Sequence, residues 1–225
     1  MTRQVLCYGD SNTWGCVPLA HPADPKRFPR AERWTGVLQS ELGPGYWIID
    51  EGLNGRTTTR DDDAEPYRNG LAFLLPTLET HHPLDLVVVM LGTNDLKQRF
   101  DASPAEIAAG AGALVDAIRK SPFGPNGGAP AVLLISPPRI GCLQQFAADF
   151  ESGFEKSQLL EPEFRRVAEA RGCAFLDARV TGSDTDGVHL DREAHASLGT
   201  AVATAVKDVL PALRPPWAGA LDGGG

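Results

Sequence analysis

Several features that would assign a chain to a large functional class are scarce in this sequence. It has only four cysteines in 225 residues and no CxxC spacing, so neither a zinc site nor a redox motif is indicated. Lysine and arginine number 21 against 29 aspartates and glutamates, and the net charge of −8 argues against nucleic acid or an anionic membrane as a partner. No apolar run approaches the ~20 residues that a bilayer span requires.

The residues that are present suit one ordinary globular domain. Hydrophobic residues make up 42% of the chain and charged residues 22%, which is typical of a protein with a buried core and a polar surface. We expect a single domain over residues 1–213 and a flexible tail over 214–225. The N-terminus enters a strand pattern at once, which leaves no space for a secretion signal. We therefore expect a cytoplasmic protein with reduced cysteines.

Strand and helix patterns alternate along the chain. Apolar runs predict strands at 3–9, 46–50, 85–91, 131–136 and 173–177. The run at 85–91 is almost continuously apolar, which is typical of a strand covered on both faces in a parallel sheet. Amphipathic helices are predicted from the capping residue Ser103, from about Leu160 to Gly172, and from Asp191 to Pro211. This order predicts an α/β fold, a three-layer α/β/α sandwich around a five-stranded parallel, flavodoxin-like sheet.

Four polar, glycine-rich segments follow predicted strands. They occupy residues 9–15, 52–57, 92–95 and 186–189. Parallel sheets bind ligands at the carboxyl ends of their strands, so we expect the four segments to form one rim. Two irregular connections, 16–31 and 137–158, should overhang this rim and shape the entrance for a substrate.

The rim contains the residue types that nucleophilic catalysis needs. A serine hydroxyl such as that of Ser11 becomes a good nucleophile only when a positioned base takes its proton. His189 is the candidate base, and Asp186 lies three positions before it, a spacing that brings two side chains to one face of a turn. Asp186 would hold the imidazole in the tautomer that leaves the other ring nitrogen facing Ser11.

An acyl transfer reaction also needs donors for a developing oxyanion. The backbone N–H of Ser11 is available at the start of a helix, and Gly55 lets the backbone approach a substrate closely. The side-chain amide of Asn94 is the third candidate donor. We place Asn12, Trp14 and Val188 among the substrate-binding residues, although Trp14 could equally belong to the core.

Two other polar features have simpler interpretations. His195 shares a helix face with Leu198 and Val202, which favours a packing role. The run Asp61-Asp62-Asp63 favours a solvated loop over a cation site, because adjacent carboxylates rarely converge on one ion. We therefore predict no metal.

The chain resembles the SGNH, or GDSL-type, serine hydrolases over nearly its full length. The resemblance rests on Gly9-Asp10-Ser11, Gly52 to Gly55, Gly92-Thr93-Asn94-Asp95 and Asp186-Gly187-Val188-His189. It implies the SGNH hydrolase fold, Ser11 as nucleophile, Gly55 and Asn94 as oxyanion donors, an Asp186/His189 pair, and no cofactor.

Within that family the chain is similar to the arylesterase and acyltransferase branch. The similarity rests on Trp14-Gly15 and on residues 33–38, 51–53 and 56–58. It implies short acyl groups, a homo-oligomer, and transfer of the acyl group to alcohols or peroxide as well as to water.

Three functions follow as hypotheses. The first is a serine esterase that cleaves short acyl esters, such as acetyl esters of aryl or alkyl alcohols, through an acyl-enzyme. The second is an acetylxylan-type carbohydrate deacetylase, against which stands the low aromatic content of 7% for stacking on sugars. The third is a non-catalytic, flavodoxin-like module that binds phosphate or flavin, which would leave Asn94 and the Asp186/His189 pair without a role.

Overall fold

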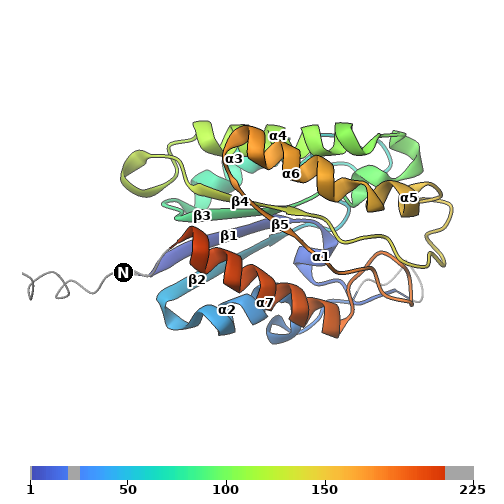
Figure 1. Ribbon diagram of the computed structural model, residues 1–225, viewed down its shortest axis with the longest axis horizontal. Helices are drawn as coiled ribbons and strands as arrows, with labels where there is room; N and C mark the ends of the chain where they lie inside the picture. The colour runs from blue at the N-terminus through green and yellow to red at the C-terminus, as the bar shows by residue number, and fades with distance from the viewer. Residues whose placement is uncertain (1, 20–25, 211–225) are drawn as a thin grey trace, which may run out of the picture.

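The computed structural model describes residues 2–19 and 26–210, and these build one parallel sheet between two layers of helices (Figure 1). The sheet order is β2-β1-β3-β4-β5, the flavodoxin-like order that the sequence predicts. The strands are β1 (Arg3–Gly9), β2 (Tyr46–Gly52), β3 (Leu86–Met90), β4 (Ala131–Ser136) and β5 (Ala174–Asp177). Each strand lies within two residues of its predicted bounds, so the predicted fold class is confirmed.

The two faces of the sheet bury separate apolar clusters. Alternate residues of β1 point to opposite sides, so Leu6 and Tyr8 join one cluster while Val5 and Cys7 join the other. Figure 1 shows α3 (Gly70–His81), α4 (Pro104–Lys120) and α6 (Leu160–Arg171) on the first face, and α2 (Trp34–Leu42) and α7 (Arg192–Val209) on the second.

The predicted helix boundaries have the expected local causes. At the start of α4 the Ser103 hydroxyl and the Glu106 carboxylate form a capping box. The Asp191 carboxylate accepts a hydrogen bond of 2.8 Å from the Ala194 N–H and caps α7. At the other end of α6, Gly172 takes a left-handed conformation with φ of 59°, which stops the helix.

Short elements cluster at the carboxyl edge of the sheet. Helix α1 (Ser11–Trp14) follows β1 directly, and the 3-10 turn η3 (Asn94–Leu96) follows β3. The connection at 137–158, expected to be irregular throughout, ends in α5 (Gly153–Gln158). This helix has no side-chain cap, and its Ser157 hydroxyl accepts a hydrogen bond of 3.0 Å from the Ile140 N–H. The helix could not be predicted from the sequence, because a tertiary contact holds it and no capping side chain marks its start.

The expected solvated loop holds for Asp61 and Asp63, which are exposed, but not for Asp62. Asp62 is only 5% exposed, and one of its oxygens accepts a hydrogen bond of 3.1 Å from Arg99 Nε. The carboxylate is therefore held by a cation from a distant segment rather than solvated.

Some predictions concern residues beyond the described structure. The predicted tail at 214–225 and the end of the last helix at Pro211 lie outside the described residues, as does part of the 16–31 connection. Within the described ranges, no helix combines the length and the apolar character needed to cross a membrane.

Candidate active site

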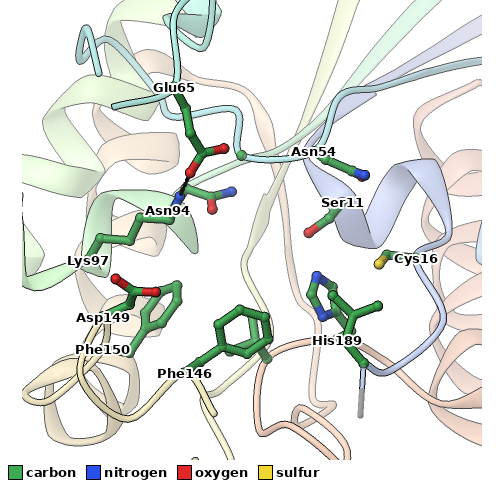
Figure 2. A pocket seen from close by; sticks show the side chains of 13 residues that line it. Ser11, Cys16, Asn54, Glu65, Asn94, Lys97, Phe146, Asp149, Phe150 and His189 are labelled. Atoms are coloured by element: carbon green, nitrogen blue, oxygen red, sulfur yellow. Dashed lines mark hydrogen bonds and ion pairs between the residues drawn. The ribbon is translucent and has the colours of Figure 1, made fainter. Parts of the chain in front are cut away.

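A cavity of about 350 Å³ opens at the carboxyl edge of the sheet, where the four polar segments meet (Figure 2). Its walls come from α1 and from the connections after β1, β2, β3, β4 and the last strand. The lining residues are Ser11, Cys16, Leu19, Asn54, Gly55, Glu65, Asn94, Lys97, Phe146, Asp149, Phe150, Val188 and His189.

Ser11 opens α1 and is 6% exposed. The carboxylate of Asp10 caps this short helix by accepting a hydrogen bond of 2.9 Å from the Asn12 N–H. Helix α1 packs so closely on β2 that a Cβ at Gly52 would lie 2.1 Å from the Trp14 backbone nitrogen. The glycine at this position therefore allows α1, the helix that carries Ser11, to pack this closely on β2.

Asp186 and His189 form a buried pair. His189 Nδ1 lies 2.8 Å from Asp186 Oδ2, and the same carboxylate accepts hydrogen bonds from the N–H groups of Leu19, Val188 and His189. Burial works against the charged carboxylate, but the bonds from His189 and from the backbone outweigh it and lower the pKa of Asp186. Asp186 is thus an anion that orients the imidazole.

The imidazole is strongly basic for a buried histidine. Burial disfavours its charged form, but the Asp186 carboxylate and the neighbouring Cys16 side chain together raise the pKa of His189 to about 9. With Nδ1 held by Asp186, Nε2 is the nitrogen available to the cavity. Figure 2 shows the Ser11 hydroxyl pointing toward the His189 ring, and these two residues from opposite ends of the chain line the same cavity.

The two other candidate oxyanion donors lie in the same cavity. Gly55 has φ of +79°, a conformation that glycine adopts without strain, in the loop after β2. Asn94 donates one amide hydrogen to the Arg56 carbonyl at 3.1 Å, which fixes the orientation of an amide that carries a second N–H. Asp95 fixes this loop by accepting bonds of 2.9 and 2.6 Å from the backbone N–H and the hydroxyl of Thr58.

Asp10 is buried beside the pair but does not belong to it. Burial raises the pKa of Asp10 to about 6, although the bond from the Asn12 N–H and the nearby His189 ring both oppose this shift. Its side chain caps α1, whereas the carboxylate that contacts the His189 ring is that of Asp186.

The three predicted substrate-binding residues do not share one location. Val188 lines the cavity, whereas Trp14 and Asn12 do not. The Trp14 ring lies 5.0 Å from the guanidinium of Arg27, outside the lining. Asn12 is fully buried and donates to the Val188 carbonyl at 3.2 Å while accepting from the Leu190 N–H at 3.0 Å. Asn12 therefore ties α1 to the His189 loop and is not available to a substrate.

His195 has the packing role that its helical position predicts. It is fully buried, and its Nδ1 accepts a hydrogen bond of 3.2 Å from the Trp34 N–H at the start of α2. Burial lowers the pKa of His195 to about 4, so the ring is neutral and joins α7 to α2.

Several lining residues were missed by sequence reasoning. The connection at 137–158 brings Phe146, Asp149 and Phe150 to the cavity, and the Phe146 ring meets the His189 ring edge-on at 5.8 Å. Glu65 and Lys97 also line it, and each lies a few residues after one of the predicted motifs, 52–57 and 92–95. Among these residues, only Lys97 could have been suspected of lining the site from the sequence, because it lies three residues after Asn94.

Known proteins resemble this chain in sequence and in fold. The GDSL-like lipase/acylhydrolase family model matches residues 7–197. An aryl esterase of M. smegmatis is 39% identical, with a TM-score of 0.89 over 93% of this chain and 100% of that chain. A carbohydrate acetylesterase from Sinorhizobium meliloti gives the same identity, TM-score and coverage. A lipase/acylhydrolase from Enterococcus faecalis, at 18% identity and a TM-score of 0.66 over 95% of this chain and 100% of that one, shares the fold. No curated protein matches at a significant level.

Proposed function

The chain belongs to the GDSL-like lipase/acylhydrolase family, with the SGNH hydrolase fold, and from this premise we propose that it is a serine esterase of short acyl esters. Membership of a hydrolase family removes the support for a non-catalytic flavin or phosphate module. The observation that carries the proposal is the meeting of Ser11, the buried Asp186/His189 pair and the donors at Gly55 and Asn94 in one cavity.

The proposed reaction proceeds through an acyl-enzyme. Ser11 Oγ attacks the ester carbonyl carbon while His189 Nε2 accepts the serine proton. The carbonyl oxygen becomes an oxyanion, which accepts hydrogen bonds from the N–H groups of Ser11 and Gly55 and from the Asn94 amide. The carbon–oxygen bond to the alcohol then breaks, and the departing alkoxide takes the proton from His189.

Water completes the cycle by the same steps in reverse order. His189 removes a proton from a water molecule, whose oxygen attacks the Ser11 acyl carbon. When the second tetrahedral intermediate collapses, Ser11 Oγ regains its proton from His189 and the carboxylic acid leaves. The anionic Asp186 stabilises the imidazolium that forms in each half of the cycle.

The size and lining of the cavity support small esters. A space of about 350 Å³ is at the lower end of the range for small-molecule sites. Four residues, Leu19, Phe146, Phe150 and Val188, give the cavity an apolar wall that suits an acetyl-sized group or an aromatic alcohol.

We propose that an alcohol or peroxide bound against this apolar wall can replace water and receive the acyl group. Formation of a new ester from ethyl acetate and an added alcohol in buffer would demonstrate this transfer.

The replacement of Ser11 by alanine tests the proposed esterase. Ser11→Ala should lower kcat on phenyl acetate by about 10⁴- to 10⁶-fold, because the nucleophile is lost while the fold remains. Ser197→Ala, at an exposed position of α7, is the matched control and should keep full activity. Turnover by Ser11→Ala near that of the control would refute the mechanism.

Carbohydrate deacetylation remains a second candidate. It is favoured by the polar side of the cavity, where Glu65, Lys97 and Asp149 offer both donors and acceptors for hydroxyl groups. The Sinorhizobium meliloti neighbour is a carbohydrate acetylesterase. Comparison of kcat/KM on acetylated xylose and on phenyl acetate separates the two: a higher value on the sugar ester would favour the deacetylase.

A further inference from the structure

A carboxylate lies beside the proposed oxyanion hole. Glu65 lines the cavity, and a Cβ added to Gly55 would come within 2.5 Å of Glu65 Oε2. The proposed reaction builds a negative charge next to the Gly55 N–H. An unpaired carboxylate at this position would repel that charge and slow the reaction.

Lys97 is placed to cancel this charge. Its Nζ lies 2.7 Å from Glu65 Oε1, and the residue is only 7% exposed, so the pair is shielded from solvent on the lysine side. Figure 2 shows Glu65 and Lys97 joined by a dashed line, across the cavity from Ser11 and His189. Lys97 directly follows the turn that holds Asn94, and it lines the same cavity as the proposed donors Gly55 and Asn94.

Two other cations lie near Glu65, but one of them is shared with another carboxylate and the other is farther away. Arg99 Nη2 lies 3.1 Å from Glu65 Oε1, but the same guanidinium holds the buried Asp62 through two hydrogen bonds. Arg68 Nε lies 3.7 Å from Glu65 Oε2, beyond hydrogen-bonding distance. Lys97 is thus the cation closest to Glu65, and among the described residues it forms an ion pair with no other carboxylate.

The carboxylate is ionised at neutral pH. Burial would favour its neutral form, but the hydrogen bond and charge of Lys97, with a smaller contribution from Arg99, lower the pKa of Glu65. The charge beside Gly55 is therefore present throughout the reaction, and so is the need to balance it.

We propose that Lys97 is a positioning residue for catalysis, whose ammonium neutralises Glu65 and so keeps the environment of the Gly55 and Asn94 donors favourable to an oxyanion. The inference rests on the proposed esterase function. It assigns Lys97 an effect on the transition state, where the negative charge exists, and not on binding of a neutral ester. The effect therefore belongs in kcat and not in KM.

Paired charge removal tests the inference with purified full-length enzyme and phenyl acetate. Lys97→Met should lower kcat by about 10- to 100-fold with KM changed less than about threefold, because Glu65 loses its closest cation while Arg99 stays shared with Asp62 and Arg68 stays beyond hydrogen-bonding distance. Adding Glu65→Gln to Lys97→Met should restore kcat to within about threefold of wild type. Glu65→Gln alone should equal or exceed wild type.

Controls separate this effect from folding and from direct contact with substrate. Lys156→Met removes a different ion pair, that with Asp101 at 3.5 Å and outside the cavity, and should leave kcat unchanged. Thermal unfolding of each variant shows which variants are folded. If Lys97→Met is unfolded, the kcat of the folded double variant relative to wild type tests the inference. A double variant at least tenfold slower than wild type would overturn the inference. That result leaves the esterase standing so long as wild-type turnover still requires Ser11.

Discussion

At the scale of single residues, the His189 imidazole determines how the rate should depend on pH. It acts as a base and must be neutral in the free enzyme, while its environment raises its pKa to about 9 from an ordinary value of 6.5. The active fraction therefore grows as pH rises. We expect kcat/KM on phenyl acetate to increase between about pH 6 and about pH 10, with a midpoint above the ordinary histidine value.

The companion variant for this profile is Asp186→Asn. Without the carboxylate, the pKa of His189 should fall and the midpoint should move to lower pH, while the maximal rate drops by about 10³- to 10⁴-fold. A wild-type profile that is flat over this range, or an unmoved midpoint in Asp186→Asn, would contradict the assigned base.

At the scale of elements, Asn12 connects the first helix to the loop after the last strand. Asn12→Ala removes both hydrogen bonds of a fully buried side chain and leaves the Val188 carbonyl and the Leu190 N–H without their partner. We expect the free energy of unfolding to fall by about 2 to 4 kcal/mol. We also expect kcat to fall with little change in KM, because Asn12 no longer holds Ser11 and His189 in their relative positions.

The control for this variant is Asn69→Ala. The Asn69 side chain caps α3 and bonds to the Thr59 carbonyl at 3.0 Å, but it does not line the cavity. Its loss should lower the melting temperature without lowering kcat. If Asn12→Ala behaves in the same way, the connection is structural only.

The elements also show how far the sequence could predict the site. Strand ends follow from local patterns, and a parallel sheet gathers its carboxyl ends, so Ser11, Asn94 and His189 could be brought together without coordinates. Phe146 and Phe150 could not, because their place depends on how a long connection folds back over the sheet. The orientation of Asn12 and Trp14 could not be predicted for a related reason. In a four-residue helix, the side chain of a residue near the nucleophile can point toward the cavity or away from it.

At the scale of the whole molecule, we propose that the chain forms a homo-oligomer. The described surface exposes several large apolar side chains, among them Trp47 at 61% and Tyr67 at 75%, and the Tyr67 and Phe73 rings meet at 6.4 Å. Such groups favour burial against another copy. Sedimentation at micromolar concentration should give a mass that is a multiple of 24.0 kDa. A single 24.0 kDa species would disprove the proposed assembly and leave the cavity unchanged.

The central claim is that Ser11 becomes covalently acylated with the help of His189. An organophosphate ester that phosphorylates activated serines, followed by intact-mass and peptide mass spectrometry, tests this most directly. We predict one adduct per chain, located on Ser11, with labelling abolished in Ser11→Ala and slowed by at least about 10³-fold in His189→Ala. An adduct on another residue, or equal labelling of Ser11→Ala, would contradict the account.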